Sequence, residues 1–396
     1  MRVLLFTGKG GVGKTTVAAA TATLAAQRGC KALLLSTDPA HSLADALDHP
    51  LGPEPVEVET GLYGQQVDTQ RRFEESWRQV RTYLVDVLDA AGVDPLEAEE
   101  LTVLPGAEEV LALLAVRDQV ASGRFDLVAV DCAPTAETLR LLALPEALEW
   151  YMRRVFPVER RVVRTLRPVL HRAVGVPMPH DRVFEAVAPA AELADVRGLL
   201  RDPRRTAVRL VLTPEAVVVA EARRMLTSLS LYGYRVDAVV ANRIFPRAGG
   251  DVWRAGWVAA QEQQLAEVDG SFAPLPVLRA GYRAGEPIGL EELAAFGAAA
   301  YGDLDPVAPL GDHAAEPLAV ERTADGFALS LGLPFADRAD VDLARRGDDL
   351  VVTVGGHRRL LTLPSALRRC DVTSARLREG RLTVSFVPDP DQWMRA

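Results

Sequence analysis

The stretch Gly8-Lys9-Gly10-Gly11-Val12-Gly13-Lys14-Thr15-Thr16 decides the fold of this chain. An apolar run at residues 3–6 precedes it and an alanine-rich run at residues 17–26 follows it, which predicts a strand, a glycine loop and a helix. The spacing fits G-x-x-x-x-G-K-[ST], a pattern typical of loops that wrap a polyphosphate. Glycines let backbone N–H groups turn toward phosphate oxygens, and the helix N-terminus adds a positive dipole. The stretch therefore predicts a nucleoside triphosphate site.

Individual side chains in this loop have expected roles. Lys14 is expected to reach the outer phosphates, and the Thr15 hydroxyl to ligate Mg²⁺. The chain has only three lysines, Lys9, Lys14 and Lys31, and uses arginine for positive charge elsewhere. Because a compact ammonium is not interchangeable with a planar guanidinium, two of three lysines in one loop indicate that Lys9 also has a function.

Length and composition narrow the class of protein. The 396 residues suffice for two or three domains, and a net charge of -9 argues against a general nucleic-acid binder. Three widely separated cysteines, Cys30, Cys132 and Cys370, argue against a disulfide framework or a local zinc site. We find no signal peptide and no apolar run near the roughly 18 residues of a membrane span. The expectation is a cytoplasmic protein with at most peripheral membrane contact.

Strand and helix patterns alternate through most of the chain, which predicts a mostly parallel, doubly wound α/β sheet over residues 1–305. Further strands are expected at 31–36, 62–68, 125–131, 207–212, 236–242 and 272–278, and further helices at 73–88, 108–120, 217–229 and 289–301.

Two polar residues end expected strands of this sheet. Asp131 follows four apolar residues and would hold Mg²⁺ through water, or it merely ends the strand. Asn242 could read a purine edge, because its amide carries both a donor and an acceptor, or it could form a turn.

Two regions depart from the α/β pattern. Residues 145–205 predict a helical insert with apolar stripes and many arginines, which either caps the sheet or forms a groove for an amphipathic or transmembrane client. A proline-rich linker at 306–316 follows the α/β region. Beyond it, apolar residues alternate with period two over residues 317–390, which predicts a small antiparallel β-sandwich.

The motifs together resemble a known family. The loop, with its early Lys9, is similar to that of the dimeric ATPases that include ParA, MinD and ArsA. Residues 37–43 (TDPAHSL) and 131–142 (DCAPTAETLRLL) resemble the branch of arsenite-pump ATPases and tail-anchored-protein targeting ATPases of the Get pathway. Residues 318–387 resemble the α-crystallin domain of small heat-shock proteins.

The resemblance implies roles for particular residues. Lys9 would reach across a homodimer to the partner's nucleotide, and Gly10 to Thr16 would wrap the phosphates of ATP. Asp38 would polarise the attacking water, Asp131 would open a second switch, and Asn242 would contact adenine. Phosphoryl transfer depends on positioning and charge neutralisation, so these residue types suit it.

The resemblance leaves three functions open. The first is an ATP-hydrolysing dimeric chaperone or targeting factor for hydrophobic clients. The second is an arsenite-efflux pump ATPase, although the chain lacks clustered cysteines and a second ATPase half. The third is a MinD/ParA-like positioning ATPase. The chain also lacks the C-x-x-C pair that binds zinc between subunits of eukaryotic targeting ATPases, so a dimer would rest on other contacts.

Overall fold

The computed structural model describes residues 1–38, 42–67, 107–133, 189–247, 252–311 and 318–390. The helix expected at 73–88 and the insert up to residue 188 lie outside these ranges. No helix in the described part of the chain is long and apolar enough to cross a membrane.

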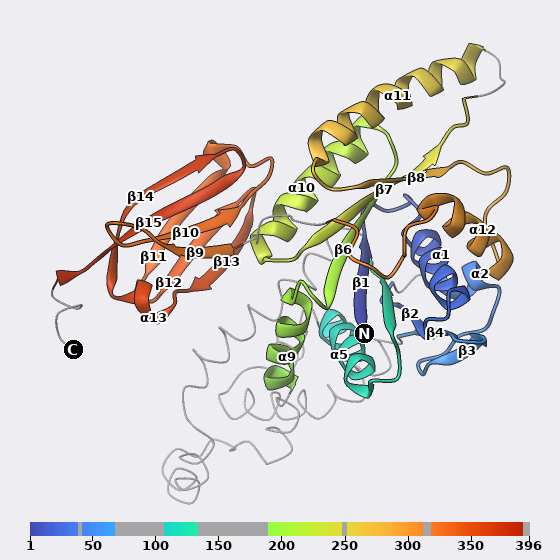
Figure 1. The fold of residues 1–396 in the computed structure, drawn as a ribbon, viewed down its shortest axis with the longest axis horizontal. Coiled ribbons are helices and arrows are strands. Elements are labelled where there is room, and N and C mark those ends of the chain that lie inside the picture. The colour runs from blue at the N-terminus through green and yellow to red at the C-terminus, as the bar shows by residue number, and fades with distance from the viewer. Residues whose placement is uncertain (39–41, 68–106, 134–188, 248–251, 312–317, 391–396) are drawn as a thin grey trace, which may run out of the picture.

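An eight-stranded sheet forms the centre of the molecule, in the order β3-β4-β2-β5-β1-β6-β7-β8 (Figure 1). All neighbouring strands are parallel except the pair β3–β4 at one edge. The bounds are β1 Arg2–Thr7, β2 Ala32–Ser36, β3 Val56–Glu59, β4 Leu62–Gln66, β5 Leu127–Asp131, β6 Thr206–Leu212, β7 Val236–Ile244 and β8 Val277–Gly281. The predicted α/β sheet is confirmed.

Helices cover both faces of this sheet, which is why the central strands are apolar along their whole length. One face carries α1 (Lys14–Gln27), α2 (Ser42–Leu47) and α12 (Leu290–Tyr301). The other carries α5 (Ala107–Ser122), α9 (Pro189–Arg201), α10 (Ala216–Tyr232) and α11 (Val252–Phe272). Parallel strands bring the loops after β1, β2, β5, β6, β7 and β8 to one edge, where the site is built.

The sequence interpretation was wrong in one segment. A strand was expected at 272–278, but Phe272 ends the 21-residue helix α11 and the strand β8 begins only at Val277. The helix was missed because it lacks a regular buried stripe: Val252, Trp253 and Trp257 are exposed in its first turns. The short antiparallel strand β3 was not predicted either.

Two antiparallel sheets form a β-sandwich after the linker. One has the order β14-β15-β10-β9 and the other β11-β12-β13. The bounds are β9 Leu318–Arg322, β10 Phe327–Gly332, β11 Val341–Arg346, β12 Asp349–Val354, β13 His357–Thr362, β14 Cys370–Arg378 and β15 Arg381–Pro388. The alternating residues of the two sheets, such as Leu331, Val352 and Val384, share one buried core, as the period of two predicted.

Candidate nucleotide and metal site

The glycine loop joins β1 to α1 in a conformation that needs its glycines. Gly11 and Gly13 have φ angles of 81° and 91°, and Gly13 is the N-cap of α1. A Cβ atom on Gly13 would lie 2.4 Å from Nδ2 of Asn242. The loop therefore packs directly on the end of β7, and the N-terminus of α1 opens beneath it.

Gly13→Ala is expected to destabilise the protein by about 1–3 kcal/mol, because the side chain forces both a left-handed backbone and a displaced Asn242. Thermal unfolding of the protein without nucleotide measures this. Gly10→Ala is the matched control, since nothing lies within 4 Å of the Cβ it would add. Equal stability of the two variants would contradict the assignment.

The two loop lysines lie in different surroundings. Lys14 is buried, and its Nζ donates to the carbonyl oxygen of Lys9 at 3.5 Å, which keeps the ammonium folded over the loop. Lys9 is half-exposed, and its Nζ lies 3.8 Å from Oε2 of Glu221 on α10. Sequence reasoning missed Glu221, because no motif connects a helix residue to a loop that lies more than 200 residues earlier in the chain.

The structure brings the two expected metal ligands together. Thr15 Oγ1 donates a hydrogen bond to Asp131 Oδ2 at 2.8 Å and lies 3.3 Å from Oγ of Ser42. Asp131 is fully buried, and its other oxygen, Oδ1, has no hydrogen-bond partner in the described structure. A buried carboxylate oxygen without a partner, beside two hydroxyl oxygens, fits a hard cation such as Mg²⁺. Ser42 was not singled out from the sequence.

Burial perturbs the carboxyl group at this point. Desolvation raises the pKa of Asp131 to about 7, with a smaller contribution from Asp38, while the Thr15 hydrogen bond and the Lys14 charge act in the opposite direction. A bound divalent cation would favour the charged form instead. Without a cation, the carboxyl group of Asp131 therefore changes its charge near neutral pH.

The segment that bears Asp38 is fastened to the same strand end. Thr37 donates its backbone N–H to the carbonyl oxygen of Asp131 at 3.0 Å, and the backbone N–H of Asp38 bonds Ser36 Oγ at 3.2 Å. Asp38 itself is half-buried. Its location next to β5 brings it to the same edge as Lys14 and Asp131. Residues 39–41 and 134–188 lie outside the described residues.

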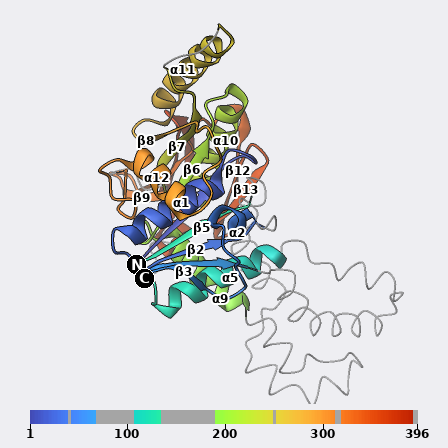
Figure 2. The same ribbon diagram turned by 90° about the vertical axis from the view of Figure 1, so that its right-hand side faces the viewer.

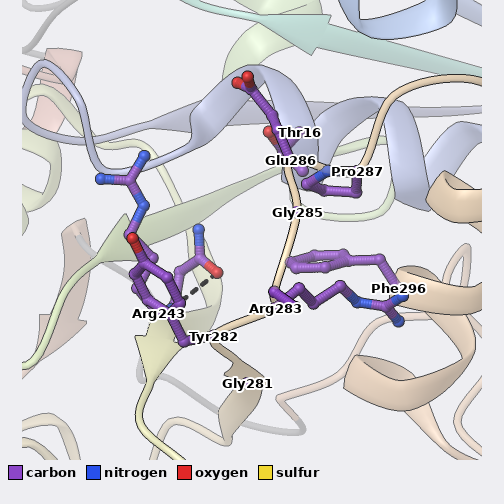
Figure 3. Close-up of a pocket in the computed structure, with 11 residues that line it drawn as sticks. Thr16, Arg243, Gly281, Tyr282, Arg283, Gly285, Glu286, Pro287 and Phe296 are labelled. Carbon is purple, nitrogen blue, oxygen red and sulfur yellow. Dashed lines mark hydrogen bonds between the residues drawn. The ribbon is translucent and has the colours of Figure 1, made fainter.

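A cavity of about 340 Å³ lies beside the loop (Figure 3). Its lining comes from α1, the end of β7, the loop after β8 and α12: Thr16, Asn242, Arg243, Gly281, Tyr282, Arg283, Ala284, Gly285, Glu286, Pro287 and Phe296. In Figure 3, Arg243 and Tyr282 lie on one side of the cavity, and Arg283 and Phe296 on the other. Its volume and its mixture of aromatic and polar groups fit a small ligand.

Asn242 is one wall of this cavity, but its amide is already hydrogen-bonded within the protein. Nδ2 donates to the carbonyl oxygen of Val12 at 2.9 Å, and Oδ1 accepts the backbone N–H of Arg243 at 2.8 Å. The residue therefore holds the phosphate loop against β7, and its predicted contact with adenine stays a prediction. Tyr282, Arg283 and Phe296 were missed; the position of 282–283 directly after a parallel strand was the available signal.

Comparison with known proteins places the chain in a family. The family described as Anion-transporting ATPase matches residues 1–302, and the HSP20-like domain found in ArsA matches residues 324–386. A relative from Prosthecochloris vibrioformis, "Putative arsenical pump-driving ATPase", is 37% identical over 98% of this chain and 96% of its own length. "Uncharacterized protein SCO2128" of Streptomyces coelicolor is 41% identical over the full length of both chains.

A more distant relative has a different name. The "ATPase ASNA1 homolog" of Babesia bovis is 28% identical over 65% of this chain and 70% of its own. The match over residues 1–302 spans the loop, the hydrogen-bonded Thr15–Asp131 pair and the adjoining cavity. The chain belongs to the anion-transporting ATPase (ArsA) family and carries that family's HSP20-like domain at its C-terminal side.

Proposed function

We propose that this protein hydrolyses ATP with Mg²⁺ at the loop of residues 8–16. The observation that carries the proposal is the buried Asp131 carboxylate, which is bonded to Thr15 and has one oxygen without a hydrogen-bond partner among the described residues. When bound there, Mg²⁺ would neutralise phosphate charge. Loop N–H groups and Lys14 would hold the phosphates, and Asp38 would orient the attacking water. The cavity at Asn242 and Tyr282 would take the nucleoside.

We also propose that the working form is a homodimer. Lys9 is the supporting residue: its side chain is 39% exposed, and its ammonium lies against Glu221 and is not folded over the loop as that of Lys14 is. A lysine in that position can turn to a nucleotide held by a second copy. Hydrolysis would then require closure of the two subunits, which gives the protein two states.

For its cellular role we propose an ATP-driven chaperone or targeting factor that binds hydrophobic protein segments. Two findings support it: the HSP20-like domain, and a relative named as an ASNA1 homolog. We expect no nucleic-acid partner, consistent with the net charge of -9.

Asp38→Asn tests this proposal by trapping the ATP state. We expect the variant to bind ATP but to hydrolyse it about 10²-fold more slowly, since an amide is a poor general base. Its mass with ATP should be that of a dimer, and a synthetic 20-residue apolar helix should bind it more tightly than a copy with two central aspartates. Asp45→Asn, at an exposed position on α2, is the control. A trapped dimer with no preference for the apolar peptide would overturn the client role.

A role in arsenite efflux is the second candidate, because relatives are named as putative arsenical pump-driving ATPases. Cys132 and Cys370 belong to two different hydrophobic cores, and no group of three His, Cys, Asp or Glu in the described residues could hold a metal ion. We therefore expect arsenite to leave the hydrolysis rate within about twofold of its value without arsenite. A larger activation, lost in a Cys30→Ser variant, would favour the pump role.

A further inference from the structure

Helix α10 extends from the phosphate loop to the β-sandwich (Figures 1 and 2). Near its start, Glu221 pairs with Lys9 of the loop at 3.8 Å. Its last turns pack against the sandwich, and Leu231 is fully buried within the sandwich core. One helix of 17 residues, about 25 Å long, therefore contacts both parts of the molecule.

The contact between α10 and the sandwich is specific. Thr227 Oγ1 donates to the carbonyl oxygen of Pro334, and the guanidinium of Arg359 on β13 donates to the carbonyl oxygen of Leu231. Arg359 is only 3% exposed, so this bond is shielded from water. The ring of Tyr232 meets that of His357 edge-on, with centroids 6.5 Å apart. Edge strand β13 is thus covered by the end of α10.

A second contact lies closer to the loop. The guanidinium of Arg223, two residues after Glu221, lies over the ring of Phe335 at 5.7 Å. Phe335 is in the turn after β10, and its ring also packs edge-on against Phe272 at the end of α11, with centroids 5.8 Å apart. One residue of α10 lies between Glu221, which contacts the loop, and Arg223, which contacts the sandwich.

The linker keeps the sandwich close to α10. Arg209 is buried between β1 and β7, donates to the carbonyl oxygen of Pro306 at 2.7 Å and pairs with Asp237. Arg235 donates to the carbonyl oxygen of Gly311 at 2.5 Å. The first part of the chain that leads to the sandwich is therefore tied to the ATPase core.

Charge supplies the switch. A triphosphate at the loop brings several negative charges, which attract Lys9 and repel Glu221, so the pair that joins the loop to α10 weakens. We propose that α10 couples nucleotide binding to the attachment of the β-sandwich: bound triphosphate loosens the sandwich from α10, and a loosened sandwich tightens triphosphate binding. The second half follows from the first, because coupling between two sites is reciprocal. The inference rests on the proposed function only in requiring triphosphate binding at the loop.

Hydrogen exchange in the full-length protein measures the first half. We expect Mg-ATP to raise amide exchange roughly threefold in β13 and in the 333–336 turn, as fits a half-exposed ion pair. Glu221→Gln should raise exchange in the same two segments without nucleotide, and Mg-ATP should then raise it little further. Glu262→Gln on α11, which breaks an ion pair with Arg247, is the control and should change neither segment.

Phe335→Ala measures the reciprocal half. Phe335 is 41% exposed, so its loss should leave the fold intact while removing the contact with Arg223. A fluorescent ATP analogue should bind this variant roughly threefold more tightly than the wild type, and Val372→Ala, at an exposed position on β14, should bind it unchanged.

Failure has separate signatures. Binding of the analogue with no change in exchange, and equal affinities in the wild type and Phe335→Ala, would overturn the coupling. A wild type that binds no analogue would overturn the proposed function. In that case the exchange of Glu221→Gln without nucleotide would decide only whether the Lys9–Glu221 pair is linked to the sandwich: a rise in β13 supports that link and no change contradicts it.

Discussion

Lys14→Ala is expected to lower the rate of ATP hydrolysis by about 10²–10³-fold, the largest effect of any single substitution considered. The side chain of Lys14 is buried, and its ammonium is held over the loop by the carbonyl oxygen of Lys9. A charge held in that position needs no reorganisation when negative charge moves onto the leaving phosphate. Phosphate release under saturating Mg-ATP measures the rate.

Lys31→Ala is the matched control for this experiment. Lys31 directly precedes β2, at the opposite edge of the sheet, and its ammonium lies over the rings of Tyr63 and Phe125 at 5.3 and 5.9 Å. Lys31→Ala removes the same charge from the protein without changing the loop, so the rate of hydrolysis should stay within about twofold of the wild type. Full activity in Lys14→Ala would show that the measured hydrolysis does not take place at this loop.

The part of the site predicted from the sequence is the part in which spacing along the chain determines the geometry. Gly13, Lys14 and Thr15 are neighbours, so strand, loop and helix place them without tertiary information. Asp131 was identified because it ends an apolar strand, and the parallel pairing of β1 with β5 brings it to Thr15. The hydrogen bond between Asp131 and Thr15 could be expected from the sequence, whereas the unpartnered Oδ1 of Asp131 could not.

The residues that escaped prediction depend on packing between distant elements. Glu221 meets Lys9 only because α10 starts at the end of β6, beside β1. Tyr282 reaches the cavity because β8 ends at the same edge as the loop. The contact of Leu231 with the sandwich is invisible in its helix, where it has the same apolar character as the residues that face the sheet. No local pattern carries such information.

The same distinction explains the fold errors. Where burial is one-sided or complete, as in β10 or β1, the periodicity or the apolar run identified the strand. Helix α11 has aromatic residues on its exposed surface, with Trp253 stacked edge-on against Trp257 at 6.2 Å, so its pattern does not report burial. Strand β3 is short and half-exposed, and it pairs at the sheet edge through only a few residues.

Asp131→Asn is expected to change stability and activity in opposite directions. The folded-state pKa of Asp131, about 7, lies above the roughly 3.9 of an unfolded aspartate, so the native state binds more protons between about pH 4 and 7. Stability from this group is therefore complete below about pH 4 and is lost as the pH rises through 7. The neutral amide has no such loss, so the variant should be more stable at pH 8 by about 2–4 kcal/mol without Mg²⁺.

Chemical unfolding from pH 4.5 to 8.5, in the presence of a chelator, measures this effect as the difference in the free energy of unfolding between Asp131→Asn and the wild type. Other titrating groups cancel in that difference, and Asp118→Asn, at an exposed position on α5, should follow the wild type. Mg-ATP hydrolysis in Asp131→Asn should fall about 10²-fold, and Mg²⁺ should stabilise the wild type more than the variant. Parallel pH profiles would mean that the carboxyl group is ionised in the empty site. A steeper loss in the wild type would mean that ionising this buried carboxyl group costs free energy of folding in the absence of Mg²⁺, a cost that the charge of bound Mg²⁺ would offset.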